Sequence, residues 1–408
     1  MILRALTLQW TAVLYVGLVS LALSVFIARQ LGPTTFGEYS LAMTIGSLLV
    51  IFIDGGMKNL LMRERILATS HLLHLSERLL AIALGNALVI SLVAILLAVI
   101  LFREHMALAL ATVGCFFGVV LAQYISSMLC GDGRLDLDAR WKMSHRTLSA
   151  VCVVSVMILG FYSPWQILAA WAFGIITASL IWSRDLRCSP SFMFHPELYR
   201  IVLPLLWIDL MTVIYFKSDI LVMQWLGVTD ALIGQYAAAC RLIEGVIFFF
   251  NPIAILIFIN FRQSDKGGRV LYRRILRSAF LAAMVGVIAA SIIAVFAEAV
   301  ISLVYGSEYR EAASLLVILA WVLAFVLPNA ILTQALLALN LERPYAWATS
   351  ISAICNVTLN VMFISSYGPQ AAAWVSIVTE MALLGMLVFV LARYRPIESA
   401  DKYVSHRC

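Results

Sequence analysis

The sequence predicts an all-α polytopic membrane protein with twelve transmembrane helices, arranged as two parallel-repeat six-helix lobes around a central cavity. Three observations favour this fold class: the composition, a series of long apolar runs, and an internal repeat. Hydrophobic residues make up 63% of the 408 residues and charged residues only 12%, whereas soluble domains have roughly half and a quarter. A chain this apolar is typical of a protein that crosses the bilayer many times.

Twelve apolar runs are long enough to cross a hydrocarbon core about 30 Å thick, which takes about 20 helical residues with tolerance on both sides. They cover residues 7–28, 39–57, 79–102, 106–129, 147–162, 165–182, 201–226, 234–261, 278–305, 312–339, 345–364 and 371–392. Of these predicted spans, the second, fifth and sixth are the shortest.

The distribution of cationic residues predicts the orientation, because Lys and Arg in short loops resist translocation. With the N-terminus inside, 23 of the 28 Lys and Arg residues fall in cytoplasmic segments, and only Arg29, Arg103 and Arg310 fall in external loops. This asymmetry predicts that both termini are cytoplasmic, and it agrees with an even number of spans. The opening segment is read as the first span rather than a cleaved signal peptide.

Two stretches about half a chain apart have similar sequences, and each lies between apolar segments. The first reads LGPT and then GEY at 31–39, and the second reads LGVT and then GQY at 226–236. A sequence repeat at a fixed period indicates an internal duplication. In an apolar chain, such a duplication is typical of transporters with the substrate path between repeated halves. We therefore expect an N-terminal lobe at 1–196 and a C-terminal lobe at 197–408, joined by the polar segment 183–200.

Several classes of site are disfavoured by the sequence. No P-loop pattern is present, so the driving energy is expected from a gradient, by proton or sodium coupling, or from the substrate. The seven cysteines form no CxxC pair, which argues against a metal site, and no other cofactor is expected. The net charge of +6 comes from basic residues beside span ends, a pattern that favours contact with anionic membrane lipid over nucleic acid.

Proline and tryptophan positions give two further expectations. Three predicted spans contain proline in their interior, at Pro204, Asn251-Pro252 and Pro328-Asn329. A proline inside a helix removes a backbone hydrogen bond and bends the helix. These positions are candidate bending points for alternating access, or kinks that packing tolerates. Tryptophans near span ends, such as Trp141 and Trp165, are expected in the interfacial aromatic belt.

Ionisable residues inside spans are the candidate functional residues, because such groups are costly in the membrane and commonly face a water-filled cavity. Most lie in the second half of the chain: Asp209, Lys217, Asp219, Arg241, Glu244, Glu298 and Glu380. Glu298 and Glu380 have no cation at matching depth, and a lone buried carboxylate would be protonated or ion-bound. Together with Asp209 they are the candidates for ion coupling.

Depth along the helices predicts which of these charges pair. Asp219 and Arg241 each lie seven residues, about 10 Å, from the turn between spans 7 and 8. Lys217 and Glu244 lie at about 13 and 15 Å by the same measure. Because consecutive spans are antiparallel, we expect two interhelical ion pairs, Asp219 with Arg241 and Lys217 with Glu244.

Two interpretations of this cluster stay open. The pairs could simply pin the helices of the second lobe together, or the cations could face a central aqueous cavity and hold an anionic group of the substrate. The repeat places Ser24, Thr44 and Ser47 at the positions that correspond to Asp219, Arg241 and Glu244. The first half is therefore polar but uncharged there, which suits a substrate with one charged end and a hydroxyl-rich remainder.

Polar rows in later spans fit either a sugar-lined path or interhelical contacts. Ser352, Asn356 and Asn360 recur every four residues, which places them on one helix face. Asn329 and Thr333 form a similar pair in span 10. In membranes, rows of this kind commonly hydrogen-bond neighbouring helices.

The ordered motifs resemble a known family. The stretch RQLGPTTFGEY at 29–39, with Asp54-Gly55-Gly56 after span 2, resembles the N-terminal signature of Wzx-type polysaccharide flippases, in the multidrug/oligosaccharidyl-lipid/polysaccharide exporter superfamily. The second half agrees through Lys217-Ser218-Asp219, the GQY motif and Arg241 to Glu244, and YGSEY at 305–309 and the segment 367–373 resemble later landmarks. The resemblance covers nearly the whole chain.

This resemblance implies a MATE-like fold and a function. It implies that the protein moves an undecaprenyl-diphosphate-linked oligosaccharide from the cytoplasmic to the outer leaflet of a bacterial inner membrane, for surface polysaccharides such as O-antigen or lipopolysaccharide. The diphosphate would bind Lys217 and Arg241, and the lipid tail would stay in the bilayer. Other polysaccharide-assembly proteins are implied as partners. Relatives that flip the cell-wall precursor carry cations in the first span, where this chain has only Arg29 at the outer end.

Two alternative functions remain at this stage. The first is an ion-coupled exporter of cationic drugs in the same superfamily, which would depend on Asp219, Glu298 and Glu380. The second is a membrane-embedded glycan polymerase or acyltransferase, which would need a catalytic group near the interface. All six histidines lie in predicted loops or tails, so the sequence favours a transporter over an enzyme.

Overall fold

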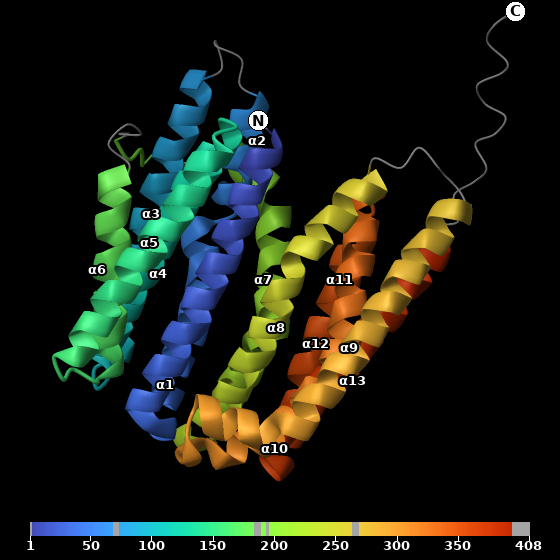
Figure 1. Ribbon diagram of the computed structural model, residues 1–408. Helices are drawn as coiled ribbons and strands as arrows, with labels where there is room; N and C mark the ends of the chain where they lie inside the picture. Colours follow the sequence, from blue (N-terminus) through green and yellow to red (C-terminus); the bar gives the residue numbers. More distant parts are fainter. Residues whose placement is uncertain (1, 68–72, 183–188, 193–195, 263–268, 394–408) are drawn as a thin grey trace, which may run out of the picture. The chain divides into compact units, whose positions relative to one another are not determined.

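The computed structural model describes residues 2–67, 73–182, 189–192, 196–262 and 269–393. These residues form helices and no strand, as the sequence predicts (Figure 1). The helices are α1 (Ile2–Asp54), α2 (Met57–Leu67), α3 (Leu73–Leu101), α4 (Met106–Gly131), α5 (Leu135–Ile158), α6 (Pro164–Trp182), α7 (Pro196–Trp225), α8 (Asp230–Arg262), α9 (Arg269–Val304), the 3-10 turn η2 (Ser307–Tyr309), α10 (Arg310–Ala320), α11 (Leu323–Ala338), α12 (Glu342–Tyr367) and α13 (Pro369–Arg393).

Among the described residues, eight helices are long and apolar enough to cross a membrane, or ten when two bent pairs each count as one span. This is fewer than the twelve predicted spans, for two visible reasons. The first two predicted spans lie in one element, α1, which counts once although its backbone breaks at Gly32. The fifth lies in α5, whose first half carries charged residues, among them Asp136 and Asp138.

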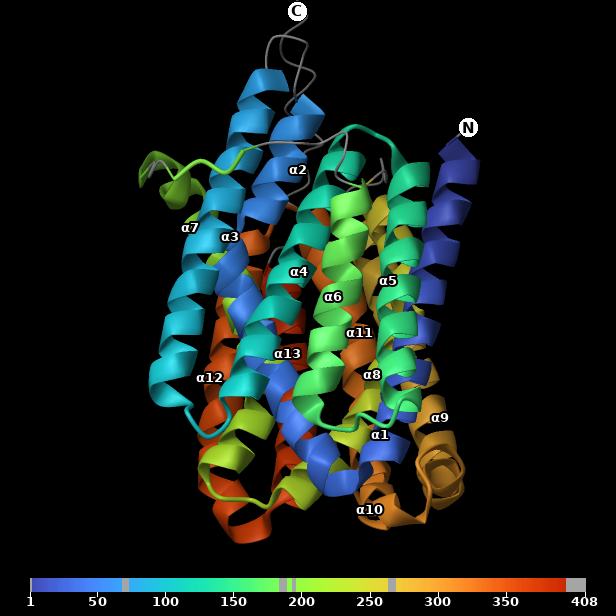
Figure 2. The same cartoon turned by 90° about the vertical axis from the view of Figure 1, so that its left-hand side faces the viewer.

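The chain divides into two compact units, Met1–Ala237 and Ala238–Cys408, with the division inside α8. In the first unit, α4 and α5 pack on α6, α1 packs on α4, α5 and α7, and α2 packs on α4. Figure 2 shows α4, α6 and α5 side by side in this unit. In the second unit, α9 packs on α10 and α11, and α13 packs on α11 and α12. The lobe boundary after residue 196 stays a prediction.

The core of the first unit contains large side chains that the sequence placed elsewhere. Trp141 is fully buried, lies tilted by 52° against Trp182 with ring centroids 5.7 Å apart, and donates its indole N–H to the Ala122 carbonyl at 3.1 Å. The expectation of an interfacial Trp141 is therefore wrong, because α5 begins at Leu135 and carries this residue into the helix bundle. Trp165, by contrast, is 43% exposed.

Of the two bends in the described helices, one coincides with a proline and the other does not. The α7 region bends by 41° between Pro196–Pro204 and Leu206–Trp225, as predicted for Pro204. The second bend, of 48°, lies between Ser307–Ala320 and Leu323–Ala338, which is before Pro328 rather than at it. The helix α8 continues through Asn251-Pro252, whose side chains lie outside the described set.

Candidate translocation site

The two copies of the repeated motif touch each other inside the first unit. A Cβ atom on Gly37 of α1 would collide with the Asp230 carbonyl oxygen, and one on Gly234 of α8 would collide with the Pro33 carbonyl oxygen. Each glycine thus lets the other copy's backbone approach closely, which a side chain would prevent. The sequence identified the two copies as equivalent but gave no sign that they pack together.

Asp219 is held by a residue of the second motif. The Tyr236 hydroxyl donates to Asp219 Oδ2, and the Ile220 backbone N–H donates to Asp219 Oδ1 at 2.9 Å. Tyr236 is fully buried and Asp219 is 9% exposed. A carboxylate that accepts two hydrogen bonds in a buried position has its charge compensated locally, and its orientation is fixed. The motif tyrosine is therefore a positioning residue for Asp219.

Arg241 forms an ion pair within its own helix. Its Nη1 lies 2.9 Å from Glu244 Oε2, one turn along α8, and both side chains are partly exposed. Lys217 is half-buried on α7. The predicted pairs of Asp219 with Arg241 and of Lys217 with Glu244 join residues of two units, and they stay predictions.

The corresponding positions of the first half carry hydroxyls. The Thr44 hydroxyl donates to the Ser40 carbonyl at 2.9 Å, and the Ser47 hydroxyl donates to the Thr44 carbonyl at 2.7 Å. Both bonds stay inside α1, a common way for hydroxyl side chains to satisfy themselves in an apolar helix. The Ser24 hydroxyl is buried without a partner among the described residues.

Asp209 pairs with a cation that the sequence analysis assigned to a loop. Its carboxylate lies 3.0 Å from Lys58 Nζ, which joins α7 to α2. Asp54 accepts the Lys58 backbone N–H at 2.9 Å and so caps the start of α2. The segment between the second and third predicted spans is thus partly helical, and a capping Asp before two glycines was the signal that could have revealed it.

The other two candidate carboxylates differ in burial. Glu380 on α13 is 3% exposed, and Asn329 Nδ2 on α11 donates to Glu380 Oε2 at 2.6 Å and to the Glu380 carbonyl at 2.9 Å. Glu298 on α9 is exposed at the protein surface, and its role in ion coupling stays a prediction.

The polar row on α12 makes contacts between helices. Asn360 donates to Asn356 Oδ1 at 2.9 Å, and Asn356 donates to the Thr379 hydroxyl of α13 at 3.2 Å. The first bond lies within α12, and the second joins α12 to α13 and favours the interpretation of the row as interhelical hydrogen bonding. The Ser352 hydroxyl and Asn360 Oδ1 are buried without a partner among the described residues.

A buried ionic network in the first unit was missed by the sequence analysis. Asp138 is completely buried and accepts bonds from Lys142 Nζ at 2.6 Å, Gln9 Nε2 at 2.7 Å and the Ser126 hydroxyl at 2.5 Å. The network joins α1, α4 and α5. Its members fall in predicted loops or near span ends, so the sequence did not distinguish them from solvated charges.

Comparisons with known proteins agree on one family. The family described as polysaccharide biosynthesis protein matches residues 26–314. The chain is 26% identical over 378 residues to the probable low-salt glycan biosynthesis flippase Agl15 of Haloferax volcanii, covering 85% of this chain and 74% of the relative. It is 28% identical over 224 residues to the succinoglycan biosynthesis transport protein ExoT of Rhizobium meliloti, covering 53% of this chain and 44% of the relative.

Solved structures show the same fold. An inward closed conformation of the lipid II flippase MurJ matches with a TM-score of 0.77 at 14% identity, covering 95% of this chain and 87% of that one. An inward-facing multidrug resistance MATE transporter matches with a TM-score of 0.69 at 14% identity, covering 95% and 98%. The family match covers most of the chain, which therefore belongs to the polysaccharide biosynthesis protein family and shares the fold of these two transporters.

Proposed function

We propose that this protein is a flippase that moves an undecaprenyl-diphosphate-linked oligosaccharide from the cytoplasmic to the outer leaflet by alternating access. The observation that carries the proposal is the family match over residues 26–314, together with a relative named as a glycan biosynthesis flippase that covers 85% of the chain. The chain is accordingly a membrane transporter of polysaccharide biosynthesis and not an enzyme. Assembly of O-antigen or lipopolysaccharide in a bacterial inner membrane, with both termini cytoplasmic, is the setting that we propose.

The charged residues of α7 and α8 are the proposed substrate-binding groups. Lys217 and Arg241 supply the positive charge that a diphosphate requires, and Asp219 and Glu244 hold the local geometry. A partly exposed arginine paired with a partly exposed glutamate can exchange that partner for a phosphate oxygen at small cost, because exposed ion pairs contribute about 0–1 kcal/mol. A pair whose carboxylate is fully buried, such as Lys142 with Asp138, cannot make this exchange cheaply.

Replacement of Lys217 and Arg241 by Ala, singly and together, tests these roles in a deletion strain that depends on the protein for surface glycan. We expect loss of surface glycan and accumulation of the lipid-linked precursor on the cytoplasmic side, with normal amounts of protein in the membrane. Arg63→Ala is the matched control, because Arg63 is an exposed arginine that pairs with the adjacent Glu64. Normal glycan output from the double variant would refute the assigned roles.

The same variants separate substrate binding from helix pinning. If the cations only hold helices together, the double variant will lose thermal stability in detergent in proportion to its loss of transport. If they bind substrate, transport will fall while the melting temperature stays close to that of the unchanged protein. Added soluble diphosphate should then raise the melting temperature of the unchanged protein only.

Glu380 is the carboxylate that we propose for ion coupling, with Asp209 and Glu298 as less suitable candidates. Glu380 is buried among polar groups, whereas Asp209 is engaged by Lys58 and Glu298 is exposed. A buried carboxylate binds a proton or a cation more readily than a solvated one. Glu380→Gln should make transport insensitive to collapse of the ion gradient, and Glu298→Gln should behave like the unchanged protein.

An ion-coupled multidrug exporter is the second candidate. The MATE transporter structure covers 95% of this chain, as the MurJ structure does, and the buried Glu380 carboxylate could bind a coupling ion. Drug-resistance profiling of a strain that overproduces the protein discriminates the two functions. Resistance that depends on Glu380, with unchanged surface glycan in the deletion strain, would favour the exporter.

A further inference from the structure

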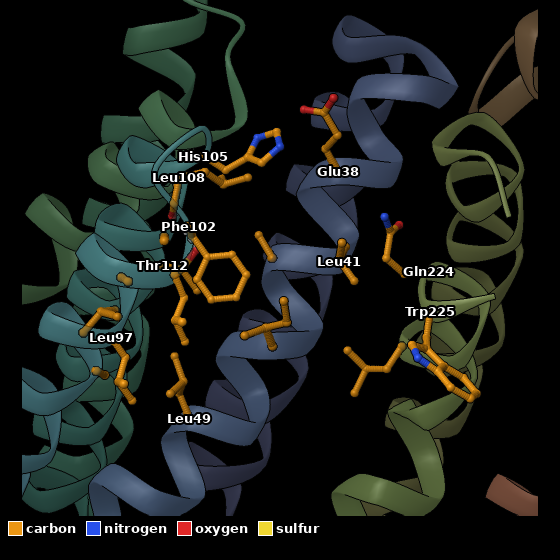
Figure 3. A pocket seen from close by; sticks show the side chains of 18 of the residues that line it. Glu38, Leu41, Leu49, Leu97, Phe102, His105, Leu108, Thr112, Gln224 and Trp225 are labelled. Carbon is orange, nitrogen blue, oxygen red and sulfur yellow. Dashed lines mark hydrogen bonds between the residues drawn. The ribbon is translucent and has the colours of Figure 1, made fainter. Parts of the chain in front are cut away.

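A groove in the first unit lies outside the proposed substrate site. It has a volume of about 600 Å³ and is lined by α1, α3, the turn after α3, α4, the end of α7 and the first residue of α8 (Figure 3). This volume lies within the range of about 300–1,000 Å³ that is typical of small-ligand sites. All its lining residues belong to Met1–Ala237.

The groove is polar at one end and apolar along its length. On α1 it is lined by Glu38 and then by Leu41, Ile45 and Leu49, a spacing of three to four residues that places them on one helix face. Glu38 to Leu49 spans about 16 Å at the helical rise, which is half of a hydrocarbon core of about 30 Å. The α1 lining of the groove is thus about as long as one leaflet is deep.

The polar lining residues lie at helix ends. Glu38, His105, Gln224 and Asp230 line the groove from the first turns after Gly32, the turn before α4, the last turn of α7 and the start of α8. Figure 3 shows Glu38 and His105 together at one end, with Leu49 and Leu97 towards the other. Thr112 is the further polar lining residue, and its hydroxyl is satisfied by the Leu108 carbonyl at 2.7 Å.

The two carboxylates at the polar end of the groove, Glu38 and Asp230, determine which charge on a ligand can be bound there. Glu38 and Asp230 oppose the negative charges of a diphosphate, and like charges brought together disfavour a wrong partner. They complement an ammonium group, while His105 and Gln224 can donate hydrogen bonds to a single phosphate. An acyl chain one leaflet long matches the apolar lining.

We propose that this groove binds a membrane phospholipid with an amine head group, of the phosphatidylethanolamine class, and not the polyprenyl carrier of the glycan. The head group lies at Glu38 and Asp230, and one acyl chain runs past Leu41 and Ile45 towards Leu49. The lipid comes from the leaflet at the Glu38 end. This inference does not depend on the transported substrate.

Native mass spectrometry of the full chain in detergent micelles tests the proposal. The probes are phosphatidylethanolamine, phosphatidylglycerol and undecaprenyl phosphate, each added at equal concentration. We expect phosphatidylethanolamine to be retained preferentially. The double variant Glu38→Gln with Asp230→Asn keeps the shape of the mouth and should lower that preference by about two- to fivefold for each carboxylate, the effect of a partly exposed ion pair.

A groove-filling variant supplies the second measurement. Ala98 of α3 lines the groove, so Ala98→Phe should abolish retention of the lipid, and Ala299→Phe on an exposed position of α9 should not. Melting temperatures of all variants show whether each one folds. Equal retention of the two phospholipids, preferential retention of undecaprenyl phosphate, or retention unchanged by both the double variant and Ala98→Phe would overturn the proposal.

Discussion

In the first copy of the repeated motif, Gly32 breaks α1 with φ 70° and ψ 169°, and Pro33 starts the next helical segment. In the second copy, Gly227 with φ 76° ends α7, the Val228 N–H bonds the Met223 carbonyl at 3.0 Å, and α8 begins at Asp230. A positive φ favours glycine at both turns. The second turn has the hydrogen bonding of a Schellman motif.

The side chains that follow these turns differ more than the backbones. Tyr39 stacks on Phe36 with ring centroids 6.0 Å apart, whereas Tyr236 donates to the Asp219 carboxylate. The two copies thus keep the same glycine turns and the reciprocal contact at Gly37 and Gly234, and in the second copy the tyrosine also bonds a buried carboxylate. Backbone geometry that both copies need is retained in each, while the buried Asp219 carboxylate corresponds to Ser24 in the first half, because each buried charge is costly without a function or a partner.

The largest expected effect breaks the feature that the copies share. Gly37→Ala and Gly234→Ala should each destabilise the protein by about 3 kcal/mol, because the new methyl group meets a backbone carbonyl that has no rotamer to change. Thermal unfolding in detergent measures this. Gly114→Ala on α4 is the control, because its Cβ position is open, and it should be neutral or stabilising. Equal melting temperatures for all three variants would contradict the close approach.

A second variant pair tests the feature in which the copies differ. Tyr236→Phe should cost about 2 kcal/mol, the typical contribution of a buried hydrogen bond to a charged group. Tyr39→Phe should cost at most about 1 kcal/mol, because the aligned position in the first half carries a serine instead of a carboxylate. A double-mutant cycle of Tyr236→Phe with Asp219→Asn should show coupling. Purely additive effects would argue against the bond.

The smallest expected effect compares the two turns. Gly227→Ala should cost about 1–2 kcal/mol for the positive φ alone, since its Cβ position is open. Gly32→Ala should cost somewhat more, because φ 70° with ψ 169° lies in a region that is almost limited to glycine. Melting temperatures rank the two, with Gly385→Ala, at a position with open space for a Cβ and a negative φ, as the reference. A higher melting temperature for Gly32→Ala than for Gly227→Ala would reverse the expected order.

The apolar helices and the family were predictable because they depend on composition and on residues in order along the chain. The bend near Pro204 was predictable from local chemistry, since proline removes a backbone bond wherever it stands in a helix. The bend between Ala320 and Leu323 was not predictable, because no proline or glycine marks it. The start of α5 at Leu135 was missed for a similar reason: its charged first half reads as a solvated loop.

Burial in the folded protein distinguishes candidate carboxylates that the sequence could not tell apart. Glu298 and Glu380 look alike in the sequence, as single carboxylates in apolar helices, but one is exposed on α9 and the other is buried against Asn329. Asp209 pairs with Lys58 of another helix, and Asp138 pairs with Lys142 one turn along its own helix. Both lysines lie outside the predicted spans, so matching charges by depth within the spans did not include them. The outward or inward direction of a side chain on an almost uniformly apolar helix leaves little periodic signal in the sequence.

The sequence by itself determined that this protein is a helical membrane transporter with two copies of one motif, because hydrophobicity, charge bias and glycine turns act locally or along the chain. Only the tertiary structure decided that Gly37 and Gly234 lie against each other's helices, that Tyr236 holds Asp219, and that a groove lies beside them. The physical reason is that close approach and pairing depend on which helix faces meet, and residues far apart in the chain determine those faces only when they pack.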